Sequence, residues 1–181
     1  MKKKNNKKKK FDYKWVLLVT ILAFLISIIF SSISETIMPN THLIVSIIII
    51  VLFILLGVIF DMVGVSSTTA DKAVFHAMSA RGIKSSKVAL KLINNSAKVS
   101  SICCDVIGDI CGIISGSCAA AISILLINNF HIKGIIISVV VTSLTAALTI
   151  GGKALGKEFA VNNSNSILDK FSRLLYPFMN R

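Results

Sequence analysis

Two aspartates interrupt an apolar segment, residues 101–127, that is long enough to cross a bilayer as a helix. Asp105 and Asp109 are four residues apart, so a helix would place both carboxylates on one face, about 6 Å from each other. A carboxylate at the centre of a membrane helix costs roughly 2.5–3.5 kcal/mol on insertion scales. The segment therefore needs neighbouring helices that cover its acidic face.

A third aspartate and a lysine are expected at the same depth. Asp61 lies near the end of one apolar segment, and Lys153 lies near the end of another. If these two segment ends lie on the same side of the membrane as Asp105 and Asp109, three carboxylates and one ammonium group come together. Their net charge is about −2, which favours binding of a divalent cation. The sequence thus predicts a metal site of Asp61, Asp105 and Asp109, with Lys153 tuning its charge.

The composition is that of a membrane protein. The chain has 181 residues, of which 54% are hydrophobic and 15% are charged, and its mean hydropathy is +0.80. Such values lie outside the range of soluble domains. We do not expect an enzyme, because no serine–histidine pair is suitably placed and because Asp105 and Asp109 share one helix instead of facing each other from two.

We expect an all-α integral membrane protein with four transmembrane helices. Apolar segments of sufficient length occur at about residues 15–34, 43–65, 101–127 and 134–155, within a membrane domain of residues 15–157.

Three polar segments flank or connect these spans. Residues 66–100 show helical periodicity broken at Gly82, which predicts an amphipathic helical hairpin on the cytoplasmic leaflet, with Ser85 or Ser86 capping its second helix. Residues 1–14 are expected to be a basic disordered tail. Residues 158–181 are expected to form a cytoplasmic amphipathic tail.

Basic residues orient these elements. Eight of the 20 lysines and arginines lie in residues 1–14 and six lie in residues 66–100, whereas the loops at 35–42 and 128–133 together hold one lysine and one glutamate. The positive-inside rule then predicts a multi-pass protein of the plasma membrane with both termini cytoplasmic. The lysine tail favours anionic lipid over nucleic acid as a partner, because it lacks arginine and has few aromatic residues.

Small residues recur at every fourth position in the last two spans. The glycines concerned are Gly108, Gly112, Gly116, Gly152 and Gly156. Glycine at this spacing lets helix backbones approach closely, so we expect these residues to form packing faces, which would also permit a homodimer.

The order of these features resembles the transmembrane domain of the CorB/CorC and cyclin-M magnesium and cobalt transporter family, over about residues 43–165. That family has a Phe-Ser-Gly-Ser-Glu-like stretch where this sequence reads Phe60-Asp61-Met62-Val63-Gly64, so Asp61 stands at a ligand serine position. Asp105 and Asp109 stand at two ligand asparagine positions. The first helix would be an addition to the family's arrangement.

The last span departs from the family pattern. It reads Ile150-Gly151-Gly152-Lys153-Ala154-Leu155-Gly156-Lys157, in which Lys157 matches the family's lysine and Lys153 replaces a glutamate that matters for metal. The resemblance implies a homodimer that binds or exports Mg²⁺, Co²⁺ or another divalent cation. The regulatory cystathionine-β-synthase-type domains that follow in the family are absent from these residues.

Two functions remain open at this point. A cation could sit among Asp61, Asp105 and Asp109, with Lys153 lowering its affinity. Alternatively, Lys153 occupies the place of the cation, and the chain is a non-transporting structural or partner-binding membrane protein held by an internal ion pair. The abundance of lysine, asparagine and isoleucine indicates an AT-rich bacterial genome.

Overall fold

The computed structural model describes residues 13–37, 42–130 and 134–179, and this part of the chain is helical throughout apart from its connections. The predicted basic tail, residues 1–14, lies outside the described residues except for Tyr13 and Lys14, which belong to the first helix. In chain order the elements are α1 (Tyr13–Ile37), α2 (Leu43–Thr69), α3 (Lys72–Ala80), α4 (Ser85–Asn94), α5 (Ser96–Ser100), the π-helical η2 (Ser101–Ile107), α6 (Gly108–Phe130), α7 (Gly134–Asn162) and α8 (Ser164–Met179).

Four helical segments are long and apolar enough to span a membrane. They are Tyr13–Ser32, Leu43–Thr69, Ser96–Ile127 and Gly134–Asn162. The predicted class, an all-α membrane protein with four spans, is therefore confirmed. Large apolar side chains remain exposed along these helices, as expected for surfaces that face lipid.

The second span runs further than its apolar residues indicate. We expected the hydroxyl residues after position 65 to begin the next helix, but they continue α2 instead. Ser67 Oγ donates to the Gly64 carbonyl at 2.7 Å, and Thr69 Oγ1 donates to the Val65 carbonyl at 3.0 Å. Hydroxyls bonded back to their own helix are satisfied there, so α2 ends only at Thr69.

The third span is a composite of α5, η2 and α6. The Gly108 N–H donates to the Cys103 carbonyl, five residues back, which is the hydrogen-bond pattern of a π-helix. The span therefore holds more residues per turn between Ser101 and Ile107 than an α-helix would. No feature of the sequence predicted this change.

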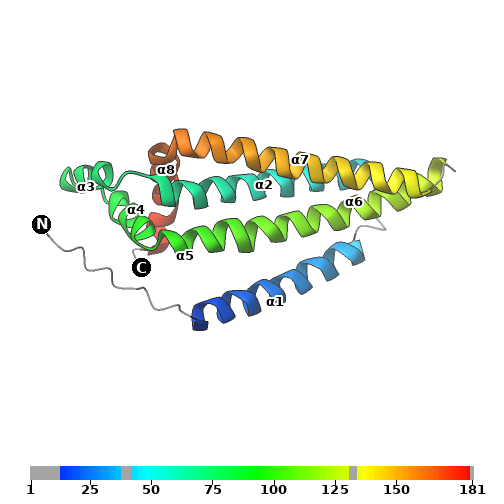
Figure 1. Ribbon diagram of the computed structural model, residues 1–181, viewed down its shortest axis with the longest axis horizontal. Coiled ribbons are helices and arrows are strands. Elements are labelled where there is room, and N and C mark those ends of the chain that lie inside the picture. Colours follow the sequence, from blue (N-terminus) through cyan, green and yellow to red (C-terminus); the bar gives the residue numbers. More distant parts are fainter. Residues whose placement is uncertain (1–12, 38–41, 131–133, 180–181) are drawn as a thin grey trace, which may run out of the picture.

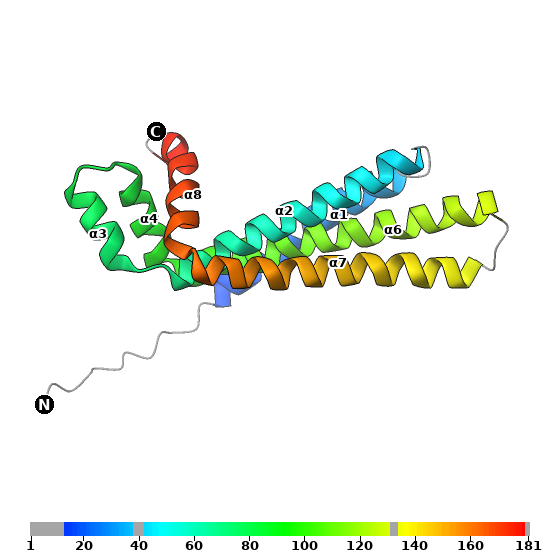
Figure 2. The same cartoon turned by 90° about the horizontal axis from the view of Figure 1, so that it is seen from above.

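The spans form an elongated bundle in which α2, α6 and α7 pack against one another (Figures 1 and 2). Buried apolar residues of α2 and the η2–α6 helix form its core, namely Ile50, Val106, Ile110, Ile114, Cys118, Ala119 and Ile122. The helix α1 lies along α6 and has no buried residue in its apolar stretch. Because four spans alternate in direction, α1 begins at the end of the bundle where α7 stops (Figure 1).

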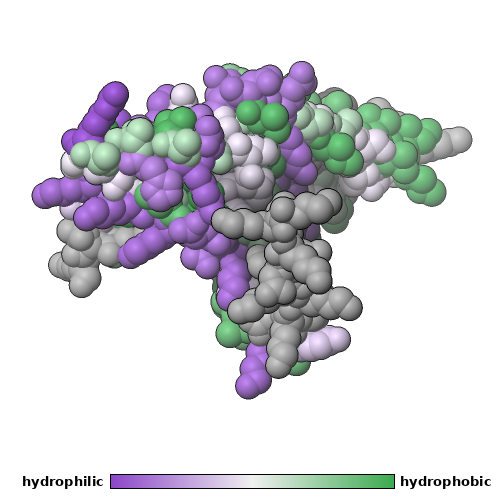
Figure 3. Space-filling view, turned by 60° about the vertical axis from the view of Figure 1, so that its left-hand side comes forward, coloured by the Kyte–Doolittle hydropathy of each residue, from purple (hydrophilic) through white to green (hydrophobic). Residues whose placement is uncertain are grey.

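A second small core lies at that end, where α8 crosses the bundle axis and packs against α4 (Figure 2). It contains Phe75, Ala89 and Leu168, all fully buried. The N–H of Asp71 donates to Asn165 Oδ1 at 2.9 Å and so ties the start of α3 to α8. Figure 3 shows hydrophilic side chains gathered around this end and hydrophobic side chains beyond it along the spans.

The helices α3 and α4 lie between the second and third spans and contact each other, and their caps differ from the prediction. Asp71 caps α3 by accepting a hydrogen bond from the Ala73 N–H at 2.8 Å. Ser85 and Ser86 are not the caps of α4, since the cap residue is Lys84 and Ser86 Oγ donates to the Ile83 carbonyl at 2.5 Å. The cytoplasmic placement of this hairpin stays a prediction.

Candidate cation site between α2, α6 and α7

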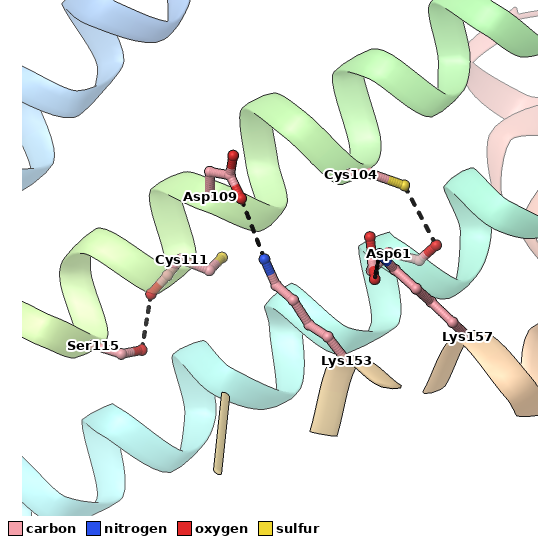
Figure 4. A network of polar contacts seen from close by, with 7 residues as sticks. All are labelled: Asp61, Cys104, Asp109, Cys111, Ser115, Lys153 and Lys157. Carbon is pink, nitrogen blue, oxygen red and sulfur yellow. Dashed lines mark hydrogen bonds and ion pairs between the residues drawn. The ribbon is translucent and has the colours of Figure 1, made fainter. Parts of the chain in front are cut away.

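Asp61 is a buried carboxylate on α2 that faces α7 and η2. Its side chain is 3% exposed, and Oδ2 lies 3.4 Å from Lys157 Nζ of α7. The thiol of Cys104 in η2 donates to the backbone carbonyl of Asp61 at 3.6 Å, so η2 covers this turn of α2 (Figure 4). Gly64 lies about one turn further along α2.

Two glycines of α2 let the third span come close enough to bury Asp61. A Cβ added at Gly57 would lie 3.1 Å from Cys111 Cβ, and one added at Gly64 would lie 3.2 Å from Cys103 Cβ and collide with the sulfur of Cys104. A methyl group at either position would therefore push a cysteine of the third span away from α2, so glycine favours this close approach. The four cysteines of the third span form no disulfide with one another, and three of them are buried.

The Asp61 carboxylate is only partly satisfied by its surroundings. Oδ2 is buried and accepts no hydrogen bond of good geometry from the described residues, so its contact with Lys157 is an ion pair at 3.4 Å. Lys157 is itself 53% exposed. A buried carboxylate oxygen normally has a close donor or a cation, because an uncompensated one is costly. Asp61 thus retains capacity for another ligand.

Asp109 is paired with the other lysine of α7. Lys153 Nζ donates to Asp109 Oδ1 at 3.3 Å, and the lysine lies over Gly108, where an added Cβ would be 3.5 Å from Nζ (Figure 4). The Lys153 side chain is 20% exposed, whereas that of Asp109 is 70% exposed. Asp109 therefore lies at the edge of the bundle and points partly away from it.

Asp105 is not drawn into either pair. Its side chain is exposed, and the ion pairs among the described residues join Lys153 to Asp109, Lys157 to Asp61 and Arg173 to Asp169. In the described part of the chain, no three side chains of the histidine, cysteine, aspartate or glutamate type lie close enough together to hold a metal ion. The structure thus gives two separate carboxylate–ammonium pairs instead of one cluster of three carboxylates.

Glycines of α7 explain how both lysines reach their partners. A Cβ at Gly156 would lie 2.7 Å from Val58 Cγ1, and one at Gly152 would lie 3.2 Å from Val58 Cγ2, so α7 is closely packed on α2 here. By contrast, Gly112 and Gly116 of α6 have no atom within 4 Å of an added Cβ. Their face of α6 is open in this chain.

Lys157 is the site residue that reasoning from the residues alone did not assign. The available signal was its position four residues after Lys153, which places both ammonium groups on one face of α7.

Comparison with known proteins adds one match. Residues 47–180 match the family model CNNM, described as the cyclin M transmembrane N-terminal domain. The chain belongs to this cyclin M family. No curated protein and no solved structure matches it. All five charged residues of the site lie inside the cyclin M match, whereas α1 lies before it.

Proposed function

We propose that this cyclin M protein binds a divalent cation within the membrane and exports it, with Mg²⁺ as the first candidate and Co²⁺ as the second. The observation that supports this most is Asp61, a carboxylate buried between spans with one oxygen short of a hydrogen bond. Hard carboxylate oxygen is the ligand that Mg²⁺ prefers, and ionisable residues inside a membrane commonly mark an ion path.

The two lysines fit the role of counter-ions that a cation displaces. Lys153 and Lys157 each neutralise one carboxylate, so together they supply the same charge as one divalent cation. Replacing both ammonium groups by the cation would leave the net charge of the site unchanged. This limits the electrostatic cost of binding and releasing the cation. Because Lys157 is half exposed, its side chain has room to move away from Asp61. The exposed Asp105 would offer a carboxylate oxygen to a cation that enters the site.

The surroundings follow from the same reasoning. The lipid bilayer of a bacterial plasma membrane would enclose the four spans, with both termini cytoplasmic, because the basic residues gather at one end of the bundle. A homodimer would cover the open face of α6, where an added Cβ at Gly112 or Gly116 would meet no atom within 4 Å and where Asp109 is 70% exposed. Covering that face would keep a carboxylate away from lipid.

One observation favours a second function. Both Asp61 and Asp109 already have a lysine partner, so the two pairs could simply lock α7 to its neighbours in a structural or partner-binding membrane protein.

Thermal unfolding of the detergent-solubilised protein, with and without millimolar Mg²⁺, separates these two functions. Saturation at about 100 times the dissociation constant would stabilise the fold by about 2.7 kcal/mol, which should raise Tm by roughly 5–10 °C for a chain of this size. Asp61→Asn should abolish the rise, while Asp169→Asn on α8 should retain it. Absence of any rise in the unaltered protein, together with no Mg²⁺ flux in proteoliposomes, would favour the structural function.

A further inference from the structure

The helix α1 is attached to the cyclin M domain by few side chains. It lies outside residues 47–180, and its partly buried contacts with the bundle core come from Val19, Ala23 and Ile26. The contact with α6 is therefore narrow, and space remains on one side of it.

That space is a cavity of about 300 Å³ between α1, α2 and the η2–α6 helix. Its walls are apolar and include Ile26, Phe30, Phe53, Phe60, Ile107 and Ile114. A water molecule or a metal ion needs polar partners, which these walls do not offer. An engineered apolar cavity of about 150 Å³ stays dry and binds benzene, so a space of this size inside a membrane suits a hydrocarbon chain.

Positive charge lies at one end of the same helix pair. Lys98 Nζ of α5 lies 4.5 Å from the centre of the Trp15 ring of α1, and Lys98 is exposed. It takes part in no ion pair among the described residues. An ammonium group without a carboxylate partner beside a tryptophan is typical of the headgroup level of a membrane.

The cationic end and the cavity lie along the same face of α1. Trp15 and Ile26 are eleven residues apart, so their side chains project within about 20° of each other around the helix axis. At 1.5 Å per residue, Trp15 and Ile26 are about 16 Å apart along the helix axis. This length is about half the thickness of the hydrocarbon core of a bilayer, roughly 15 Å, and so matches the reach of an acyl chain from its headgroup.

We propose that an anionic phospholipid binds between α1 and the α5–η2–α6 helix. Its phosphate lies at Lys98, beside Trp15, and one acyl chain occupies the apolar cavity. A peptide fits less well, because its backbone N–H and C=O groups would have no partners in these walls. The proposal does not depend on cation binding, since the cavity and its cationic end exclude Asp61, Asp105 and Asp109.

Native mass spectrometry of lipid retained by the full chain tests this site. The protein is reconstituted in nanodiscs of equal phosphatidylglycerol and phosphatidylcholine, extracted, and assayed for lipid bound per chain. We expect about one phosphatidylglycerol to be retained selectively, and a several-fold loss with Ile26→Trp, which fills the cavity. Ile28→Trp, at a lipid-facing position of the same helix that is 47% exposed and does not line the cavity, should not change retention.

A second variant tests the lysine that would bind the lipid headgroup, so the result does not depend on whether Ile26→Trp folds. Lys98→Gln should lower phosphatidylglycerol retention several-fold, whereas Lys87→Gln, an exposed lysine of α4, should leave it unchanged. Equal retention of both lipids would overturn the proposal, because no headgroup would be recognised. Equal losses with Lys98→Gln and Lys87→Gln would also overturn it, since they would indicate diffuse attraction to basic surface.

Discussion

The ammonium nitrogen of Lys153 lies 3.3 Å from Asp109 Oδ1 and joins α7 to α6 within the membrane-spanning part of the protein. One turn later on α7, Lys157 contacts Asp61 of α2 at 3.4 Å. Two positions four residues apart on one helix thus reach two different neighbours. The two ion pairs join the three central spans within about one helical turn, in addition to the close contacts at the glycines.

Removing Lys157 should destabilise the protein. Lys157→Met leaves the buried Asp61 carboxylate without its cation, a change that costs up to 3–5 kcal/mol for a fully buried pair; because Lys157 is half exposed, we expect about 2 kcal/mol. Denaturant unfolding in detergent measures this. Lys170→Met on α8 is the matched control, and Asp61→Asn combined with Lys157→Met should recover most of the loss. If the losses of stability caused by the two substitutions simply added in the double variant, the two side chains would not be coupled.

The two carboxylates should differ in their effect on cation binding. Asp61 is buried, whereas Asp109 is 70% exposed at the edge of the bundle. Asp61→Asn should therefore abolish Mg²⁺-dependent stabilisation, and Asp109→Asn should weaken the apparent affinity by about tenfold, equivalent to about 1.4 kcal/mol. Mg²⁺ titrations followed by thermal unfolding give both values. Equal loss in the two variants would show that burial does not set the ranking.

Close packing of α7 on α2 should make Gly156 sensitive to a single methyl group. In Gly156→Ala the new Cβ would lie 2.7 Å from Val58 Cγ1, and valine has little rotamer freedom in a helix, so we expect a loss of about 1–3 kcal/mol. Gly151→Ala is the control, because that position has open space within 4 Å. Unfolding curves of both variants, with Val58→Ala as a rescue for the first, check this prediction.

The open face of α6 should matter for assembly and not for the fold of one chain. Gly116→Trp places a large side chain where no atom of this chain lies within 4 Å, so the helices should fold unchanged. If this face forms the proposed homodimer, light scattering on the solubilised protein should show a dimer for the unaltered chain and a monomer for the variant. A variant that remains a dimer would place the interface elsewhere.

The four spans were predictable because each has about 20 apolar residues, and their number and type agree with the structure. Their ends were not, since Ser67 and Thr69 satisfy their own hydroxyls within α2 and extend it. Sequence position also predicted that Lys153 and Asp109 lie at similar levels of their spans, and the two residues are in contact.

What the sequence could not provide is the rotation of each helix about its own axis. That rotation decides that Asp61 points inward to Lys157 while Asp105 is exposed. It depends on close contacts such as Gly57 with Cys111, which involve residues far apart in the chain. The π-helical turn before Gly108 changes it again, and no residue pattern indicated that turn.

The five-residue hydrogen bonds of η2 set the angular position of everything that follows in the third span. A π-helix turns less per residue than an α-helix, so the seven residues of η2 turn the span about as far as six α-helical residues would. Deleting one residue between Ser101 and Ile107 would therefore restore ordinary α-helical bonding and leave Asp109, Gly112 and Gly116 on the faces of α6 that they now occupy. The same deletion inside α6 would instead turn every later residue of the span by about 100°.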